Sequence, residues 1–490
     1  MRLKDICREI EYECLSGSMQ TEVSGLVYDS RKAAENTVFF CITGAVSDGH
    51  SYIPDVISKG VCAVVLEKEE YAAQIPGKIT VIKVSSARRA LAFMSAAFFG
   101  YPARKLKTIG ITGTKGKTTT AYMIKSMLEM TGKKVGLIGT IGIMTADELI
   151  PTKNTTPESY ELHRAFSQMV SAGCEYLVME VSSQGLKLDR TAGIEFDLGV
   201  FTNLSPDHIG PAEHSSFEEY LYCKSLLLRQ CKTGIVNADD PHVSEIIKDA
   251  SCSIETFGLE NDADLKASDL KLFSGSGVLG IRYRLGGKAD MDVEVDIPGR
   301  FSVYNSLTAI AVCLHFTDDK ELILKALKNV RVKGRVEIVP VSEKYTVIVD
   351  YAHNAVSLES ILETLKEYEP KRLVCLFGCG GNRSKARRYE MGEVSSRLAD
   401  LTIVTSDNPR FEKPEDIIED IITGVKRTGG DYIVIENRKE AIFYALENAK
   451  EGDVIVIAGK GHEDYQEIKG IKYHYNDVET IMEYVKIKNI

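Results

Sequence analysis

Residues 107–130 read KTIGITGTKGKTTTAYMIKSMLEM, and this stretch decides the fold class of the chain. Its apolar beginning, 107–112, predicts a buried strand, and 117–130 has the apolar spacing of an amphipathic helix. Glycines lie between the two, followed by a lysine and three threonines. A glycine-rich turn lets backbone N–H groups converge on phosphate oxygens, and the following helix N-terminus adds partial positive charge. The stretch therefore predicts a phosphate-binding loop at the edge of an α/β sheet.

The side chains of this loop suit a nucleoside triphosphate with a magnesium ion. Lys117 is expected to reach the β- and γ-phosphates, and the Thr118 hydroxyl to take a Mg²⁺ site. The loop departs from the common GxxxxGK[ST] pattern, because Ile111 stands where that pattern has glycine. The alternative is a turn that binds nothing, which the GKT ending and the strand–helix context disfavour. The predicted ATP-binding residues of the loop are Gly113, Thr114, Lys115, Gly116, Lys117, Thr118 and Thr119.

The chain divides into three sections, each with a pattern of strands and helices typical of an α/β domain. Residues 1–104 hold short β-branched runs and a long helical stretch that ends before Tyr101-Pro102. Residues 105–330 alternate apolar strands with amphipathic helices, which favours a mostly parallel sheet covered on both faces. Residues 331–490 repeat that alternation. We expect a small α/β N-terminal domain, a central P-loop ATPase-like parallel sheet and a C-terminal Rossmann-like doubly wound sheet.

Length and composition limit the classes of protein that fit. The 490 residues correspond to about three domains. A content of 44% hydrophobic and 27% charged residues excludes a disordered or fibrous chain. The net charge of −10 argues against a protein that coats nucleic acid, and no apolar run approaches the ~18 residues of a membrane span. The N-terminus has no secretory pattern, and the cysteines form no CxxC pair, so we expect a cytoplasmic protein. We also expect a monomer.

The loop and a series of later motifs resemble the Mur ligases and the related folylpolyglutamate synthetases, which are ATP-dependent amide-forming enzymes. The later motifs, in the order of the family, are NTTP (154–157), MEVSS (179–183), FTNLSPDH (201–208), Asn305 in GRFSVYNSLTA, Arg335 in KGRVE and DYAHN (350–354). Each is short, but the ordered set is specific and covers most of the chain. Within the family it most resembles the ligases that add a diamino acid to UDP-N-acetylmuramoyl-L-alanyl-D-glutamate in peptidoglycan precursor synthesis.

The resemblance implies an acyl-phosphate mechanism. A substrate carboxylate would attack the γ-phosphate of ATP, and an amine would then displace phosphate to leave an amide. Phosphoryl transfer depends mainly on positioning and charge neutralisation, so the site needs cations and Mg²⁺ ligands. The implied catalytic residues are Lys117, Glu180, His208 and Lys224. The implied metal ligands are Thr118, Glu180, His208 and Lys224. Asn305, Arg335, Asp350 and His353 complete the implied ATP site.

Lys224 would have the most unusual of these roles. The residue pattern alone, in the helical run EEYLYCKSLLL, favours a solvated lysine, because lysines are mostly exposed. The matching lysine of the family is carbamylated by CO₂, which turns a cation into an anion able to hold Mg²⁺. The sequence between His208 and Lys224 differs from the one usual in the family. Two single residues differ as well: Lys115 stands where Asn is usual, and Ala355 where Pro often stands. Neither Lys115 nor Ala355 removes a catalytic group.

The resemblance also implies where the first substrate binds. The segment LVYDSR, 26–31, resembles the one that holds the UDP group, although by itself it reads as a polar turn after a strand. Leu188 stands where some members have Gln, so one substrate hydrogen bond is absent or supplied elsewhere. We expect 1–104 to bind UDP, 105–330 ATP and Mg²⁺, and 331–490 the amino acid, with the third domain closing onto the second. The implied UDP-muramoyl-dipeptide-binding residues are Ser30, Thr155, Thr156, Ser182 and Arg190.

The run TSDNPRFE, 405–412, is the most informative about the amine donor. It follows an apolar strand, and ligands bind at the C-terminal edge of a parallel sheet. The planar guanidinium of Arg410 matches a carboxylate, which the distal end of meso-diaminopimelate has and L-lysine lacks. DNPR is also the motif by which diaminopimelate-adding ligases are recognised. The implied diamino-acid-binding residues, each otherwise a surface charge or a turn, are Arg388, Asp407, Asn408, Pro409, Arg410, Gly459 and Glu463.

Other functions stay open at this point. One is the same type of ligase with L-lysine or another diamino acid as its donor. Another is a non-catalytic paralogue that senses nucleotide or UDP-muramoyl precursors, although such a paralogue has no reason to keep all four implied catalytic residues. A folylpolyglutamate synthetase fits less well, because it has no use for the section before the loop. A P-loop motor is disfavoured, because the chain has no Walker-B aspartate pair and no basic track.

Overall fold

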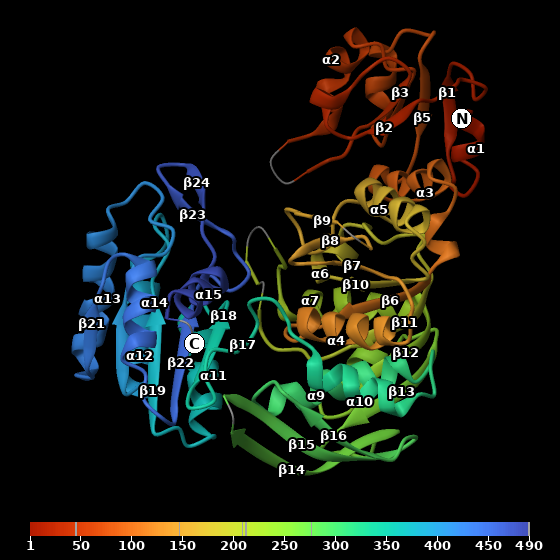
Figure 1. Cartoon of the computed structure of the whole chain (residues 1–490). Helices are drawn as coiled ribbons and strands as arrows, with labels where there is room; N and C mark the ends of the chain where they lie inside the picture. Colours follow the sequence, from red (N-terminus) through yellow and green to blue (C-terminus); the bar gives the residue numbers. More distant parts are fainter. Residues whose placement is uncertain (45–46, 147, 208, 211–212, 276, 489–490) are drawn as a thin grey trace. The chain divides into compact units, whose positions relative to one another are not determined.

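The computed structural model describes residues 1–490 except 45–46, 147, 208, 211–212, 276 and 489–490. The described chain forms two compact units, each treated by itself below (Figure 1). The first consists of residues 1–264 and 308–317, and the second of residues 265–307 and 318–490. Within the described residues, no helix has the length and apolar character needed to cross a membrane.

The first unit begins with a small α/β domain. Its sheet has the order β1-β5-β4-β3-β2 and is parallel except for β1, which runs antiparallel to β5. Strands β3 and β4 are buried along their whole length, as expected for strands with helices on both faces. The elements are α1 (Leu3–Ile6), β1 (Glu13–Ser16), β2 (Gly25–Val27), η1 (Ser30–Lys32), β3 (Thr37–Phe40), η2 (Gly49–Tyr52), α2 (Ile53–Ser58), β4 (Ala63–Leu66), η3 (Glu69–Gln74), β5 (Thr80–Lys83), α3 (Ala87–Phe98) and η4 (Pro102–Lys105).

A second sheet in this unit contains the glycine-rich loop. The part of that sheet within this unit has the strand order β13-β12-β11-β6-β10-β7-β8-β9, parallel from β13 to β7 and antiparallel at β8 and β9. The strands are β6 (Lys107–Thr112), β7 (Val135–Gly139), β8 (Gly142–Met144), β9 (Leu149–Ile150), β10 (Tyr176–Glu180), β11 (Phe196–Phe201), β12 (Cys231–Asn237) and β13 (Ser253–Gly258). The helices are α4 (Lys117–Met130), α5 (Ser159–Ser171), α6 (Ser183–Lys187), α7 (Phe217–Ser225), η5 (Leu226–Arg229) and α8 (Val243–Ile247).

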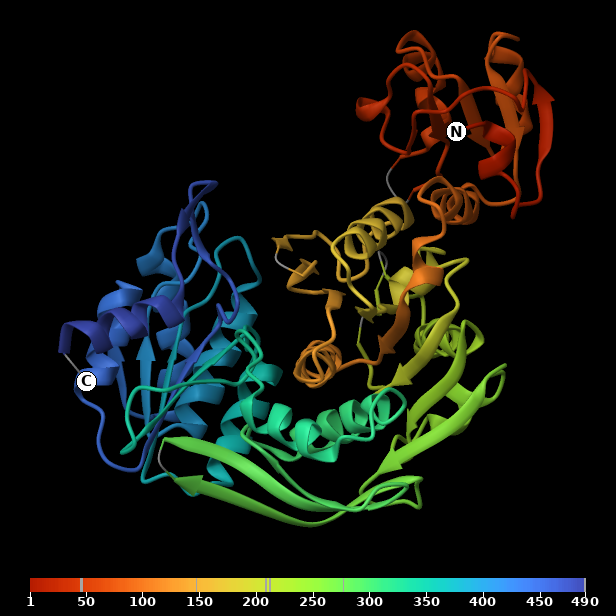
Figure 2. The ribbon, with the colours of Figure 1, turned by 45° about the vertical axis from the view of Figure 1, so that its right-hand side comes forward.

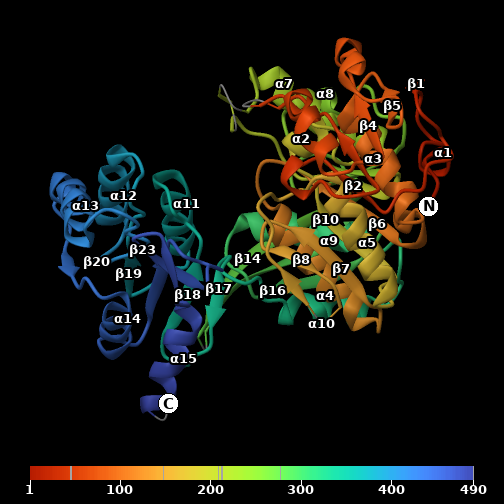
Figure 3. The ribbon, with the colours of Figure 1, turned by 90° about the horizontal axis from the view of Figure 1, so that it is seen from above.

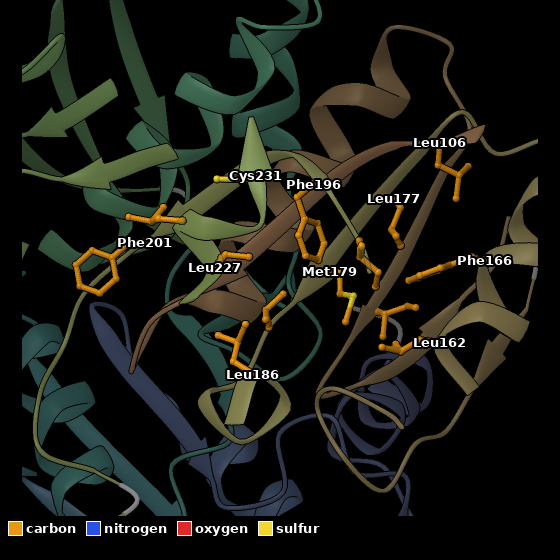
Figure 4. Close-up of a cluster of buried hydrophobic side chains, with 14 of the residues drawn as sticks. Leu106, Leu162, Phe166, Leu177, Met179, Leu186, Phe196, Phe201, Leu227 and Cys231 are labelled. Carbon is orange, nitrogen blue, oxygen red and sulfur yellow. The ribbon is translucent and has the colours of Figure 1, made fainter. Parts of the chain in front are cut away.

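The register of the central strands puts three loops at one edge. Ile111 of β6 pairs with Glu180 at the end of β10, and Thr112 pairs with Phe201 at the end of β11. The core beneath includes Phe166 from α5 and Met179 from β10 (Figure 4). Helix α5 also lies beside α3 of the N-terminal domain (Figure 2). The glycine-rich loop and the segments after β10 and β11 therefore start from a rigid, buried base.

The second unit begins with an antiparallel meander that the alternation of strands and helices in the sequence does not predict. It consists of β14 (Leu265–Gly275), β15 (Val278–Gly287) and β16 (Met291–Val295), paired in that order. Side chains on β15 and β16 alternate between buried and exposed, as in a sheet with one solvated face. Helix α9 (Arg300–Cys313) crosses the boundary between the units, and α10 (Lys320–Asn329) follows.

The rest of the second unit is a doubly wound sheet with the order β17-β18-β22-β19-β20-β21, parallel except for β17. Helices α11, α12 and α13 cover one face and α14 and α15 the other (Figure 3). The predicted α/β class is thus confirmed. The strands are β17 (Glu337–Val339), β18 (Thr346–Asp350), β19 (Arg372–Phe377), β20 (Leu401–Val404), β21 (Tyr432–Val434), β22 (Asp453–Ala458) and the hairpin β23 (Tyr465–Ile468) and β24 (Ile471–His474). The helices are α11 (Ala355–Lys366), α12 (Lys385–Leu398), α13 (Pro414–Thr428), α14 (Arg438–Glu447) and α15 (Asp477–Lys488).

Candidate active site

The glycine-rich loop joins the buried end of β6 to the first turn of α4. Gly113 and Gly116 have φ angles of +149° and +85°, which favour glycine, and a Cβ on Gly113 would collide with the Thr202 hydroxyl. Lys117 Nζ donates to the carbonyls of Gly113 and Thr114 at 2.7 and 3.0 Å. The predicted phosphate-binding residues thus form one tight turn with an ammonium folded back over it.

The segment after β11 supports this loop through Asn203, a member of the FTNLSPDH motif to which the sequence assigned no role. Asn203 Oδ1 accepts from the Lys115 N–H at 2.9 Å, and Asn203 Nδ2 donates to the Lys115 carbonyl at 3.0 Å. The Asn203 carbonyl accepts from the Thr114 N–H at 2.8 Å. The Tyr220 hydroxyl lies 3.1 Å from Thr114 Oγ1. Because β6 and β11 are neighbours, the FTNLS run lies where it can fix the shape of the loop.

Glu180 ends β10 beside the loop, and its side chain is 1% exposed. Its Oε1 accepts from Thr118 Oγ1 at 2.9 Å and from the Thr140 N–H at 3.0 Å, and its Oε2 accepts from Thr140 Oγ1 at 3.2 Å. These hydrogen bonds compensate the cost of burying a carboxylate. Thr140, which sequence reasoning missed, follows β7 and also lies 3.1 Å from Thr155 Oγ1.

Lys224, in α7, is 2% exposed, so the solvated position favoured by its residue pattern alone is wrong. Its Nζ donates to the Gly113 carbonyl at 2.7 Å and lies 4.5 Å from the centre of the Tyr220 ring. Burial, with the Lys117 ammonium nearby, lowers the pKa of Lys224 well below its usual value. Both influences disfavour the charged form, so they favour a neutral amine next to the loop.

The residues of this edge fit a hard cation such as Mg²⁺. Thr118 and Glu180 offer oxygen ligands within hydrogen-bonding distance of each other, which is the donor type that Mg²⁺ prefers. Lys224 would add further oxygens only as a carbamate. His208, the fourth predicted ligand, lies outside the described residues. Within the described part of the chain, no group of three or more His, Cys, Asp or Glu side chains could hold a metal ion.

Four of the five residues predicted to bind the muramoyl-dipeptide come together around the end of β10. Thr156 Oγ1 donates to the Glu180 carbonyl at 3.0 Å and accepts from the Ser182 N–H at 2.9 Å. Arg190 donates to the Thr156 carbonyl at 2.9 Å, and Thr155 approaches Glu180 through Thr140. The fifth residue, Ser30, begins η1 in the N-terminal domain and is not part of this cluster.

Arg190 is held by a small ion-pair network that reaches the N-terminal domain. Its guanidinium lies 2.8 Å from Glu158, which also pairs with Arg88 of α3 at 3.2 Å. Nearby, the Tyr28 hydroxyl of the VYDSR segment donates to Glu161 of α5 at 2.8 Å. The predicted UDP segment and the predicted dipeptide residues are thus tied to the same helix, α5, and its N-terminal flank.

In the second unit, three of the predicted ATP residues meet beside β17 and β18: Arg335 precedes β17, Asp350 ends β18 and His353 follows it. Asp350 is buried, and its carboxylate accepts from the N–H groups of Val336 and Ala352 at 2.8 Å each. Burial raises the pKa of Asp350. The Arg335 guanidinium lies 4.8 Å from the centre of the Tyr351 ring, and the exposed His353 ring lies 4.7 Å from it. Asn305 is buried in α9.

The predicted diamino-acid residues converge at the C-terminal ends of β20 and β22. Asn408 Nδ2 donates to Glu463 Oε2 at 2.9 Å. Gly459 has φ +110°, and a Cβ there would approach Asp407 Oδ2 to 2.8 Å. Arg410 donates to the Gly381 carbonyl at 2.7 Å, and its side chain is 23% exposed. The carbonyl of Pro409 lies so close to Gly381 that a Cβ on Gly381 would collide with it.

Arg388 reaches this loop indirectly. Its side chain, in α12, is 1% exposed, and it donates to Glu412 at 2.7 Å and to Asp420 at 2.9 Å. The Arg388 guanidinium therefore already pairs with two carboxylates, and one of them, Glu412, lies two residues after Arg410. Its direct contact with a substrate remains a prediction. Two partners that sequence reasoning missed are Glu467, which lies 3.2 Å from Arg410, and Lys460, which is buried beside Asn408.

Comparisons with known proteins agree along the whole chain. Three family models match: Mur ligase family, catalytic domain (22–99), Mur ligase middle domain (111–313) and Mur ligase, glutamate ligase domain (334–461). UDP-N-acetylmuramoyl-L-alanyl-D-glutamate–2,6-diaminopimelate ligase 1 of Clostridium acetobutylicum is 44% identical over 99% of both chains. The ligase of that name from Clostridium perfringens is 42% identical over 100% of both chains.

Solved structures show the same relationship. A UDP-N-acetylmuramoyl-L-alanyl-D-glutamate–2,6-diaminopimelate ligase superposes with a TM-score of 0.73 at 27% identity, covering 100% of this chain and 99% of that chain. Folylpolyglutamate synthase of Mycobacterium tuberculosis, solved with ADP and AMPPCP, shares the fold with a TM-score of 0.59 at 19% identity. That match covers 76% of this chain and 92% of the other.

Proposed function

This chain belongs to the Mur ligase family, and we propose that it adds meso-2,6-diaminopimelate to the D-glutamyl carboxylate of UDP-N-acetylmuramoyl-L-alanyl-D-glutamate at the expense of ATP. The observation that carries the proposal is the DNPR loop facing Glu463 at one edge of the C-terminal sheet. Arg410 supplies a planar donor pair for a carboxylate, and Glu463 supplies an acceptor for an ammonium. A diamino acid with a distal carboxylate matches both, whereas L-lysine leaves Arg410 without a partner from the substrate.

ATP is proposed to bind at the glycine-rich loop. The backbone N–H groups of the loop and of the first turn of α4 receive the phosphate oxygens. Lys117, whose ammonium is hydrogen-bonded to two loop carbonyls in this structure, is proposed to turn that ammonium toward the phosphates when ATP binds. Asn305, Arg335, Asp350 and His353 are proposed to complete the nucleotide site.

Mg²⁺, when bound, neutralises phosphate charge as the γ-phosphoryl group moves to the substrate carboxylate. Thr118, Glu180, a carbamate on Lys224 and His208 are the residues proposed to hold it. The depressed pKa of Lys224 supports the carbamate, because only a neutral amine has a lone pair free to attack CO₂. In that step Nζ bonds to the carbon of CO₂ and releases one proton, so the neutral side chain gains one negative charge.

The three sections are proposed to divide the substrates. Residues 1–104 bind the UDP group, with Ser30 among the contacts. Residues 105–330 bind ATP and hold the muramoyl-dipeptide through Thr155, Thr156, Ser182 and Arg190. Residues 331–490 bind the amine donor, whose neutral amino group displaces phosphate from the acyl phosphate and forms the amide. The Glu158 network supports this division, because it holds Arg190 from the side of α3.

Phosphate release from ATP tests the proposal. The enzyme is supplied with UDP-N-acetylmuramoyl-L-alanyl-D-glutamate and, in parallel reactions, with meso-diaminopimelate, L-lysine or L-ornithine. Release with diaminopimelate alone is the expected result. A preference for L-lysine would keep the ligase activity and reject the assigned amine donor. Release with none of the three would reject the ligase proposal and favour a precursor-sensing role.

A further inference from the structure

Lys460 is a fully buried lysine next to the DNPR loop, and the proposed chemistry gives it no role. It follows β22 in the run GKGHE, and its side chain is 0% exposed. Its Nζ lies 3.1 Å from Asn408 Oδ1, 3.4 Å from Asp407 Oδ1 and 3.5 Å from Glu463 Oε2. A buried ammonium needs compensating groups around it, and here these groups belong to the residues predicted to bind the diamino acid.

Two donors determine which way the Asn408 amide points. Its Oδ1 accepts from Lys460 Nζ and from the backbone N–H of Glu467 at 2.9 Å. A lysine ammonium and a backbone N–H offer only donors, so the amide oxygen must face them and the amide nitrogen the other side. That nitrogen, Nδ2, donates to Glu463 Oε2 at 2.9 Å. Lys460 therefore fixes the orientation through which Asn408 holds Glu463.

The Glu463 carboxylate is held through one of its two oxygens. Asn408 Nδ2 and Lys460 Nζ both approach Oε2, and Oε1 takes no part in these two contacts. The Glu463 side chain remains 18% exposed, so a ligand can reach it. Asp407 and Glu463 both lie beside the one ammonium of Lys460, and the buried Arg438, which also acts on Asp407, is already paired with Asp477. These charged side chains together have one negative charge in excess. A ligand ammonium balances that charge with a charge-assisted hydrogen bond.

We propose that Lys460 is a positioning residue for the amine donor: it orients Asn408 and Glu463 so that Glu463 receives the ammonium at the distal end of the diamino acid. This inference rests on the proposed function, because it takes the DNPR edge as the amine-donor site. Lys460 itself touches no substrate. It serves recognition of the distal ammonium, whereas Arg410 serves recognition of the distal carboxylate.

The test compares two amine donors that differ only at the distal ammonium. meso-Diaminopimelate has it, and L-2-aminopimelate keeps both carboxylates but lacks it. In Lys460→Met, KM for diaminopimelate should rise about tenfold or more, because a hydrogen-bonded charge is no longer held in place. KM for L-2-aminopimelate, ATP and the muramoyl-dipeptide should change by less than about twofold. Lys460→Gln, which keeps a donor toward Asn408, should fall between wild type and Lys460→Met.

Lys472→Met is the matched control. Lys472 and Lys460 both lie against the Tyr465 ring, at 3.7 and 5.8 Å from its centre, but Lys472 belongs to β24 on the exposed hairpin. Its loss should leave KM for both donors unchanged. A similar rise for both donors in Lys460→Met would overturn the proposal, because it would indicate general damage to the site. Unchanged KM for diaminopimelate in Lys460→Met and Lys460→Gln would overturn it as well.

A double variant separates positioning from mere stability. Asn408→Asp removes the donor to Glu463, so adding Lys460→Met should raise KM for diaminopimelate little further if Lys460 acts through Asn408. Multiplied effects would overturn the proposal. Thermal melting shows which variants are folded, and Lys460→Gln with Asn408→Asp provide the test if Lys460→Met unfolds. A wild type inactive with both donors would reject the proposed function and this inference together.

Discussion

Among the residues that the structure describes, two lysines are buried near sheet edges, and their surroundings differ in charge. Lys224, 2% exposed, faces a loop carbonyl, and burial together with the nearby Lys117 ammonium outweighs the Asp207 carboxylate, so the pKa of Lys224 is lowered. Lys460, 0% exposed, faces the carboxylates of Asp407 and Glu463. Burial alone therefore does not define what a lysine does. Among carbonyls and another cation it is driven toward a neutral, reactive amine, and among carboxylates it holds their charges in place.

The largest expected effect comes from removing the reactive lysine. Lys224→Met should lower kcat by about 10²–10³-fold, because the site loses a group that stabilises charge during phosphoryl transfer. With ¹³C-labelled bicarbonate, wild type should show one carbamate resonance that Lys224→Met lacks and Lys460→Met retains. The exposed Lys232→Met is the activity control. A resonance that persists in Lys224→Met would assign the carbamate to another lysine.

The second largest expected effect comes from removing Arg410 at the proposed amine-donor site. Arg410→Ala should raise KM for meso-diaminopimelate about 10²-fold while KM for ATP stays constant, because a charged donor pair for the distal carboxylate is lost. Steady-state kinetics with each substrate varied in turn provide the measurement. Arg427→Ala, which removes an exposed arginine paired with Glu393, should leave both KM values unchanged. An unchanged KM for diaminopimelate in Arg410→Ala would contradict the proposed role of Arg410 in donor specificity.

Stability should respond in opposite directions at the two lysines. Between the lowered pKa of Lys224 and its ordinary value near 10.4, the unfolded chain binds a proton that the folded chain does not, so stability rises with pH across that window. In CO₂-free buffer at neutral pH, Lys224→Met should therefore stabilise the fold by about 1–2 kcal/mol. Lys460→Met should destabilise it by about 3 kcal/mol, because two carboxylates lose their cation.

Denaturant unfolding of both variants at several pH values measures this difference. The gain from Lys224→Met should shrink as pH approaches the ordinary lysine pKa, because the unfolded chain then loses the same proton. Destabilisation by both substitutions would contradict the contrast between the two environments. If Lys224→Met raises the free energy of unfolding by the same amount at every pH, the added stability comes from better packing of Met and not from removal of a buried ionisable group.

The smallest expected effect concerns the support of the glycine-rich loop. Asn203→Ala removes both side-chain hydrogen bonds to the Lys115 backbone, so KM for ATP should rise about five- to tenfold. KM for diaminopimelate should stay constant, because both side-chain hydrogen bonds lost with Asn203 belong to the glycine-rich loop and Asn203 is not among the residues predicted to bind the diamino acid. Isothermal titration with a non-hydrolysable ATP analogue checks the change in affinity. Unaltered affinity would show that the loop keeps its shape without Asn203.

The sequence predicts the parts of each site that belong to one local pattern. The strand–loop–helix of 107–130, the acidic end of β10 and the DNPR turn after β20 are all where these patterns indicate. Partners from elsewhere in the chain are not predictable in this way. Thr140 follows a neighbouring strand before it meets Glu180, and nothing in the helical run around Lys224 signals that its amine turns toward the loop. Such contacts depend on strand order, which local periodicity does not contain.

The central claim is the choice of amine donor, and a competition reaction tests it most directly. Equimolar meso-diaminopimelate, L-lysine and L-ornithine are offered together with ATP and UDP-N-acetylmuramoyl-L-alanyl-D-glutamate, and the masses of the nucleotide-linked products are measured. The account predicts one product, whose mass increase corresponds to diaminopimelate. A lysine- or ornithine-containing product as the main species would contradict it.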